Sequence, residues 1–361
     1  MTTLSINTPQ TEAELKAFAG FPDRVYEYRS ARWKAPIDYH LSFLNGTNPF
    51  ASGRHLRPFV ALKAGEIVAR VLAVADDRYR QQWQETLGHL CWFEALPNEP
   101  EAVQLLFDAA CEWLAKRGLT AARVGYHSAL LDNPFAADNY DTLPPSLVRQ
   151  NPPYYHALLK EAGCELEKGF TDYIVAATPK AISHWQAAID RVSSAGYNIR
   201  PLRAVPEADR APQLAALFNE TFASHWGWSA WSETEAAFFI QSLEPIGILD
   251  FVAFAYEENH PVGFISLFPE MSGGAFLAEG RVLDDREKLN ALNVGVCDKA
   301  RGRGLGLALT GYGFLELARR GATYLGYSLV RDDNYASRRV ARKLGAQVRA
   351  TYAAYRRNFS G

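Results

Sequence analysis

The sequence predicts an α/β protein with a mixed sheet, and it predicts that this fold occurs twice. Strand-like and helix-like segments alternate along the chain, and each half opens with two β-rich runs joined by a short turn. The later elements then follow in the same order in both halves. A Rossmann fold fits less well, because the leading hairpin is antiparallel and no Gly-x-Gly-x-x-Gly follows its first strand.

The hairpins are the first matched elements of the two halves. Residues 59–62 and 67–74 flank a turn at Ala64-Gly65 in the first half, and residues 251–256 and 262–268 form the counterpart in the second. The second hairpin follows a helix predicted from the spacing of its apolar residues, Leu214, Leu217, Phe218 and Phe222.

The remaining elements repeat the order helix, strand, helix, strand. Glycine is a frequent helix terminator, and it ends the matched helices of both halves. These helices stop at Gly118 and Gly321, then at Gly163 and Gly345, and the final strands are expected at 171–177 and 347–355. We therefore expect a first domain over 1–178, a linker over 179–200 with one short helical run, and a second domain over 201–361.

Composition narrows the class of function. The 361 residues include 38 Lys and Arg against 40 Asp and Glu, a formal charge of −2, which argues against a protein that coats nucleic acid or an acidic membrane. No run of about 20 apolar residues and no signal-like start is present, so we expect a cytoplasmic protein without a membrane partner. The 4 cysteines and 8 histidines are scattered, which predicts no metal site.

One segment has an unusual pattern: a strand, a basic glycine-rich turn and a helix follow one another between Asn293 and Leu315. The turn reads Arg301-Gly302-Arg303-Gly304-Leu305-Gly306. Glycines let consecutive backbone N–H groups point into one hollow, and the start of the next helix adds unpaired amides and its positive dipole end. This arrangement suits a pyrophosphate. No Lys-Ser or Lys-Thr pair follows, so it is not a Walker loop.

The turn resembles the acetyl-CoA signature of the GNAT family of N-acetyltransferases, with Arg301, Gly304 and Gly306 in its fixed positions. Asn334, Ser337 and Gly345 match the family's second motif on the following helix. The resemblance implies two tandem GNAT-like domains. It further implies an acetyl-CoA site at residues Val294, Val296, Cys297, Arg301, Gly302, Arg303, Gly304, Leu305, Gly306, Asn334 and Ser337.

In the family the pantetheine arm pairs with the strand before the turn, and one amide of that strand polarises the thioester carbonyl. The resemblance assigns this role to the amide of Val296, and Cys297 itself is expected to be a small core residue.

The family's usual acid and base are missing. The position that often carries a glutamate base falls near Asn290, and the tyrosine that often protonates the departing thiolate would be at Ala341. Several substitutes are open and are not ranked. Glu279 or Asp285 can act as base through water, His225 can act directly, and Tyr352 or Tyr355 can serve as acid. His225 adjoins Trp226, Trp228 and Trp231, which form either a wall of the acceptor pocket or a packing surface for the other half.

The first half lacks the phosphate turn. At the matching place it has Pro97-Asn98-Glu99-Pro100, where prolines remove amide donors and the glutamate repels anions. It also has an irregular insertion over 127–153, expected to pack between the domains or to serve function. We expect this half not to bind CoA, but to contribute stability, part of the acceptor pocket, or both.

The resemblance implies direct N-acetyl transfer from acetyl-CoA to a small amine or amino acid, without metal. A homodimer is open as an expectation. Two alternatives remain open. One is a non-catalytic acyl-CoA sensor or scaffold, motivated by the missing glutamate and tyrosine. The other is an aminoacyl-tRNA-dependent transferase on a paired fold, against which the CoA turn and the lack of a broad basic surface count.

Overall fold

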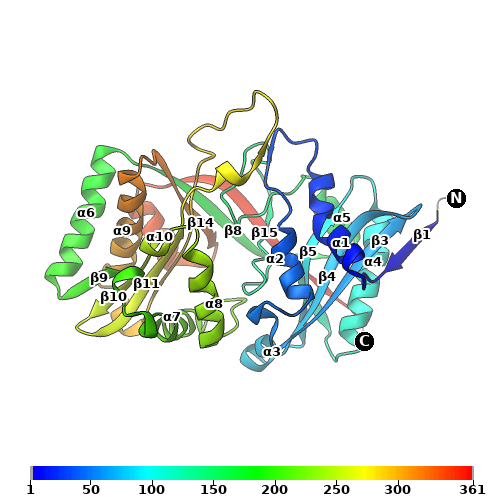
Figure 1. Ribbon diagram of the computed structural model, residues 1–361, viewed down its shortest axis with the longest axis horizontal. Helices are drawn as coiled ribbons and strands as arrows, with labels where there is room; N and C mark the ends of the chain where they lie inside the picture. Colours follow the sequence, from blue (N-terminus) through cyan, green and yellow to red (C-terminus); the bar gives the residue numbers. More distant parts are fainter. Residues whose placement is uncertain (1–2, 360–361) are drawn as a thin grey trace.

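The computed structural model describes residues 3–359, which form two α/β halves side by side (Figure 1). The predicted α/β class and mixed sheet are confirmed. The first half consists of β1 (Leu4–Asn7), α1 (Glu12–Val25), β2 (Ala31–Arg32), α2 (Ile37–Leu44), β3 (Arg54–Lys63), β4 (Glu66–Asp76), α3 (Asp77–Trp83), β5 (Leu87–Ala95), α4 (Pro100–Ala115), β6 (Ala121–Val124), β7 (Phe135–Ala136), α5 (Tyr155–Glu161) and β8 (Glu165–Ala176).

The second half repeats this order. It consists of α6 (Pro179–Ser194), β9 (Tyr197–Pro201), α7 (Glu207–Phe222), α8 (Glu233–Leu243), β10 (Val252–Glu257), β11 (His260–Phe268), β12 (Phe276–Leu277), β13 (Ala291–Val296), α9 (Leu305–Arg319), β14 (Tyr324–Arg331), α10 (Tyr335–Lys343) and β15 (Gln347–Asn358). Antiparallel pairing of β3 with β4 and of β10 with β11 gives the two expected hairpins.

The two halves exchange their last strands. The large sheet has the order β1-β3-β4-β5-β6-β15-β8-β14, with β7 beside β15. The last strand of the first half, β8, therefore pairs with β14 of the second half, and the last strand of the second half, β15, pairs with β6 of the first. Both strands cross the middle of the molecule, and the C-terminus lies with the first half (Figure 1). Neither half has a complete sheet without the other.

The segment expected to be a linker is instead part of the second half. Thr178 caps α6, Pro179 occupies its first turn, and Trp185 is fully buried against the ring of Phe314 on α9, with ring centroids 5.4 Å apart. β9 pairs with β10 and is the outer strand of the smaller sheet, whose order is β13-β11-β10-β9. The amphipathic spacing of α6 suits burial of one face, and sequence reasoning recognised only its helical character.

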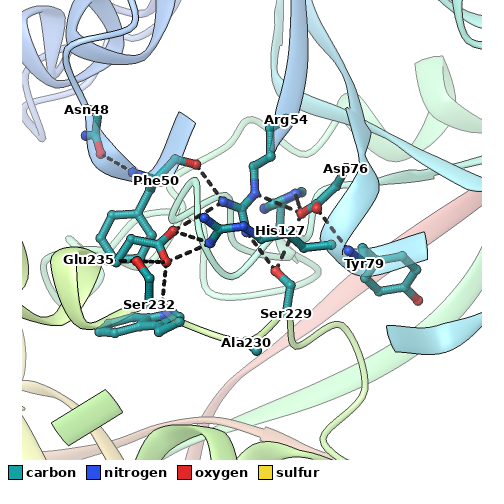
Figure 2. A network of polar contacts seen from close by, with 12 residues as sticks. Asn48, Phe50, Arg54, Asp76, Tyr79, His127, Ser229, Ala230, Ser232 and Glu235 are labelled. Carbon is teal, nitrogen blue, oxygen red and sulfur yellow. Dashed lines mark hydrogen bonds and ion pairs between the residues drawn. The ribbon is translucent and has the colours of Figure 1, made fainter. Parts of the chain in front are cut away.

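A buried polar network joins the halves (Figure 2). Arg54 on β3 donates to Asp76 at 2.8 Å, to Ser229 Oγ at 2.9 Å and to Glu235 at 3.4 Å. Arg78 of α3 adds a second contact to Glu235 at 2.6 Å. Burial acts to raise the pKa of Asp76, but His127 and Arg54 outweigh it and hold the pKa well below its usual range.

Because these charges are paired and out of water, loss of one partner would leave a buried charge uncompensated. The network therefore fixes the second-half segment 229–235 against the first half.

Candidate functional site

Strands β13 and β14 part from each other in the second half. β13 is the edge strand of the small sheet, and β14 is the edge strand of the large one. Where they meet, the buried side-chain amide of Asn290 donates to the carbonyl of Gly326 at 3.0 Å and accepts from its N–H at 2.8 Å. A Cβ on Gly326 would lie 2.3 Å from the Asn290 carbonyl oxygen, so only glycine fits there. Asn290 therefore joins the two edge strands at this end, and we call the unpaired stretch between them beyond this contact the opening.

The open edge of β13 offers two backbone amides. Cys297 N–H bonds to Val262 on β11 at 2.9 Å, and N–H groups alternate sides along an antiparallel strand, so the N–H groups of Val294 and Val296 point away from β11. The Val296 carbonyl faces the same way, since it accepts from Arg301 Nε at 3.2 Å rather than from a strand. An extended ligand can pair with this edge as an additional strand would.

The glycine-rich turn lies directly after β13 and forms the cap of α9. Gly302 and Gly304 have φ of +81° and +89°, in the region that side chains disfavour. The first helical bond runs from Ala308 N–H to the Gly304 carbonyl, which leaves the amides of residues 305–307 without helical partners. Exposed, left-handed glycines before a free helix start fit a pyrophosphate group.

The two arginines of the turn lie beside it and are paired with acids. Arg301 contacts Asp298 at 2.6 Å, and Arg303 donates to Tyr197 Oη at 2.6 Å and to Glu257 at 2.9 Å. Both guanidinium side chains are about half exposed. The main-chain amides are therefore the fixed donors of the anion site. The two arginines are held in place only weakly, because their ion pairs with Asp298 and Glu257 are exposed to solvent.

Helix α10 borders the other side of the opening. Asn334 caps it by accepting from Ser337 N–H at 3.1 Å, and Ala341 is fully buried. Tyr327 of β14 is also buried, and burial raises its pKa to about 12 even though a hydrogen bond with Ser337 acts in the opposite direction.

His225 is a poor proton acceptor in this structure. Burial, followed by the charge of Arg331, lowers its pKa to about 4, and its Nδ1 lies 3.2 Å from the Trp226 carbonyl. The neighbouring tryptophans pack rather than line an open pocket: Trp226 lies under the Arg123 guanidinium at 3.8 Å, Trp228 against Phe222 and Trp231 against Phe50. Their main contribution is contact within the second half and with the first.

The two candidate tyrosines of β15 have separate surroundings, because the strand exchange carries β15 into the first half. Tyr355 bonds to His156 of α5 at 2.6 Å and so belongs to the first half. Tyr352 is buried and accepts from Arg349 at 3.2 Å, and Arg349 also donates to Asp172 of β8 at 2.8 Å. Sequence reasoning missed Asp172 and Arg349. The available signal was a charged residue within each of two apolar strands.

The remaining candidates lie on the surface or in the core. Glu279 is exposed on the long loop between β11 and β13, and Asp285 of the same loop pairs with Thr323 at 2.8 Å and Lys288 at 3.1 Å. The structure does not bring either one to the open edge of β13. Cys297 is fully buried, and burial followed by Glu220 raises its pKa to about 12, which suits a core thiol and not a nucleophile.

The matching place in the first half is closed. Strands β5 and β6 pair in parallel from Leu87 to Leu90. Beyond that point Arg149 of the insertion donates to the Phe93 carbonyl at 3.0 Å, and Tyr155 and Tyr154 bond to the N–H and carbonyl of Ala95, each at 2.8 Å. Protein side chains thus occupy the backbone groups that a ligand would use.

The start of α4 is equally unsuited to an anion. Glu99 is its N-cap, Pro100 occupies its first turn, and Glu101 follows. Negative charge and a missing N–H at a helix start oppose phosphate binding.

Comparison with known proteins finds a family match in the second half. Residues 212–346 match the Acetyltransferase (GNAT) family. Protein YghO of Escherichia coli K12 is 24% identical over 275 residues, which cover 74% of this chain and 68% of that protein. The bacterial ceramide synthase of Caulobacter vibrioides is 23% identical over 283 residues, covering 78% and 73%.

Solved structures are similar over the whole chain. A tandem GNAT protein from the clavulanic acid biosynthesis pathway has a TM-score of 0.57 at 12% identity and covers 99% of both chains. A GCN5-related glucosamine N-acetyltransferase region of a fungal multi-domain GH3 β-N-acetylglucosaminidase has a TM-score of 0.59 at 17% identity. This match covers 99% of our chain and 38% of that longer one.

The similar solved structures show that the chain has a tandem GNAT-like fold. The match to the GNAT family model over residues 212–346 and the tandem GNAT-like fold agree with the resemblance drawn from the turn. Across residues 3–359, the structure contains no helix with the length and hydropathy to cross a bilayer.

Proposed function

We propose that the protein transfers an acyl group, acetyl in the simplest case, from acyl-CoA to the amine of a small molecule. The observation that carries this proposal is the opening between β13 and β14, with two free amides on its edge and a glycine turn at its end. Acyl-CoA supplies an activated thioester when bound. The chain's own residues supply the positioning described next.

The amides of residues 305–307 and the left-handed Gly302 and Gly304 hold the pyrophosphate, and Asn334 keeps the start of α10 in place beside the opening. The edge of β13 holds the pantetheine arm. Val294 and Val296 both present N–H groups to that edge, so either can donate to the thioester oxygen as negative charge develops there. Sequence reasoning assigned this role to Val296 alone.

The acceptor must lose a proton before it attacks. For an alkylammonium with a pKa near ~10, this costs about 4 kcal/mol at neutral pH unless the protein assists. Asn290 cannot accept a proton and its side chain holds Gly326, so the base must come from elsewhere.

A thiol-release assay with acetyl-CoA over a panel of amines tests the proposal. Catalysis predicts free CoA that depends on the acceptor. A non-catalytic acyl-CoA sensor predicts binding without turnover, and that result would overturn the proposed activity.

A long-chain amine is a second candidate acceptor, suggested by the Caulobacter relative's description as a ceramide synthase. The loop between β11 and β13 pairs with the first half through β12 and β2, and it exposes Phe276, Leu277 and Val282. Val282 is 80% exposed, so this loop offers apolar surface that a long-chain acceptor can contact. Including long-chain amino alcohols and long-chain acyl-CoA in the panel separates this candidate from the first.

A further inference from the structure

We propose that Asp172, on the exchanged strand β8, binds the ammonium group of the acceptor and takes its proton. This inference rests on the acyl-transfer function proposed above. It assigns to the first half a direct part in the chemistry of the second.

The Asp172 carboxylate is buried, and only one of its two oxygens is hydrogen-bonded. Asp172 is fully buried, and its Oδ2 accepts from Arg349 Nε at 3.0 Å and Nη2 at 2.8 Å. Its Oδ1 has no hydrogen-bond partner of normal geometry within residues 3–359; the Leu329 N–H faces the carboxylate without completing such a bond. A buried carboxylate oxygen without a donor is costly, and such an atom is a reason to expect a ligand.

The surroundings suit an organic cation. Phe170 lies two residues before Asp172 and so faces the same side of the sheet. It belongs to an apolar cluster with Tyr352 of β15, against which Tyr126 and Tyr140 pack, partly buried. Aromatic faces beside a carboxylate form a site for an ammonium group.

The position of Asp172 along the opening also suits a base for the acceptor. β13, α9 and β14 form a strand-helix-strand unit, so the two strands run in the same direction from the Asn290–Gly326 contact. Leu329 of β14 and Asn293 of β13 each lie three residues beyond that contact, about 10 Å along. Leu329 has a φ of +49° at an irregularity in the pairing with β8, and its backbone N–H faces the Asp172 carboxylate. Asp172 therefore lies about as far along the opening as Val294, whose amide we expect to contact the ligand.

The insertion covers Asp172 and Arg349 through only a few contacts. From the insertion, Asn139 donates to the Arg349 carbonyl at 3.2 Å, and Thr142 accepts from Arg349 at 3.5 Å. Residues 137–139 of this segment are exposed. The insertion therefore covers the acceptor site, and a bound amine would replace part of that cover.

The proton balance is complete. One N–H bond of the ammonium breaks, its proton goes to Asp172 Oδ1 and the electron pair stays on nitrogen. The nitrogen forms the amide bond as the carbon–sulfur bond breaks, and a second N–H proton passes to the thiolate sulfur. Asp172 then returns its proton to water.

The charges near Asp172 come from several elements. Arg349 and Tyr352 face it from β15, and Asp138 lies beyond Tyr352 on the insertion. Burial raises the pKa of Asp172 against the opposite effect of Arg349 and the Leu329 amide, which favours a carboxylate able to accept a proton.

The test compares two acceptors in Asp172→Asn. Butylamine is an ammonium at pH 7, whereas hydroxylamine is largely neutral. We expect kcat/KM for butylamine to fall about 100-fold and to recover as the pH is raised, with a change below about 5-fold for hydroxylamine. Equal losses for both acceptors would indicate a structural role and overturn the proposal, as would no loss for butylamine.

A binding measurement gives a second readout that needs no turnover. With CoA present, butylammonium should bind the wild type at least about 10-fold more tightly than Asp172→Asn, while 1-butanol should bind both equally. Glu165→Gln, which removes an exposed carboxylate from the same strand β8, is the matched control and should behave as wild type.

If Asp172→Asn does not fold, because Arg349 is left unpaired, the double variant Asp172→Asn, Arg349→Gln removes both charges. Normal acylation of butylamine by that variant would overturn the proposal. If the wild type acylates no amine, the proposed function fails, and butylammonium binding still decides the role of Asp172.

Discussion

The two halves have a similar order of elements, but the edge of β5 in the first half is covered, whereas the edge of β13 in the second half is open. In the first half, β5 stays paired with β6, and Arg149, Tyr154 and Tyr155 bond to the backbone beyond the paired region. In the second half, β13 and β14 do not pair. Asn290, just before β13, bonds to Gly326, its carbonyl accepts from Ser328 Oγ at 3.5 Å, and the edge of β13 is open. The two halves therefore differ at one strand edge: side chains bond to the backbone of β5, whereas the N–H groups of Val294 and Val296 on β13 have no protein partner among the described residues.

The glycine turn gives the largest expected difference between the halves. Gly304→Glu should reduce CoA affinity by more than about 100-fold, because a charged side chain at φ +89° would displace the phosphate and strain the turn. Calorimetric titration measures the affinity. The matched control is Gly118→Glu in the first half, also at positive φ and with open space around it. Unchanged affinity in Gly304→Glu would refute the assignment of the turn.

Removing Arg149, which bonds to the backbone of β5 in the first half, should lower stability without creating a CoA site. Arg149→Ala leaves the buried carboxylate of Asp132 without its ion-pair partner, so we expect a loss of about 3 kcal/mol in the free energy of unfolding. Because the start of α4 still opposes an anion, the CoA stoichiometry should remain one per chain. Denaturant titration and calorimetry measure these quantities, and a second CoA site would contradict the account.

The contact between β13 and β14 can be weakened on its own. Asn290→Ala removes both hydrogen bonds to the buried Gly326 backbone, and we expect a loss of about 2 kcal/mol in the free energy of unfolding. CoA affinity should also fall, since the edge of β13 loses its fixed position. Circular dichroism during urea unfolding measures the first effect. A stability equal to wild type would show that Asn290 does not hold the opening.

Acid should weaken the second half through His225. Its folded pKa, about 4, is below the unfolded value near 6.5, so the unfolded chain binds the proton first and stability falls as pH drops from about 6.5 toward 4. Between pH 7 and pH 5 this histidine accounts for up to about 2 kcal/mol, the smallest of these effects. His225→Asn should reduce the acid-induced loss, measured by urea unfolding at both pH values. An unchanged loss would mean that His225 is not held neutral by burial.

The sequence predicted the repeat, the hairpins and the turn, because these depend on local patterns such as Gly304 at a helix start. It did not predict the strand exchange, because the patterns of β8 and β15 are equally satisfied beside either half. That single non-local fact separates Tyr352 from Tyr355 and brings Asp172 to Arg349. Residues 179–200 also belong to the second half, since α6 packs against α9 and β9 is an edge strand of the smaller sheet.

Hydrogen exchange with and without a non-hydrolysable acetyl-CoA analogue tests the central claim most directly. The account predicts that the ligand slows exchange of the Val294 and Val296 amides and of residues 304–307, while residues 91–95 of β5 exchange at the same rate. Protection of β5, or no protection along β13, would contradict it.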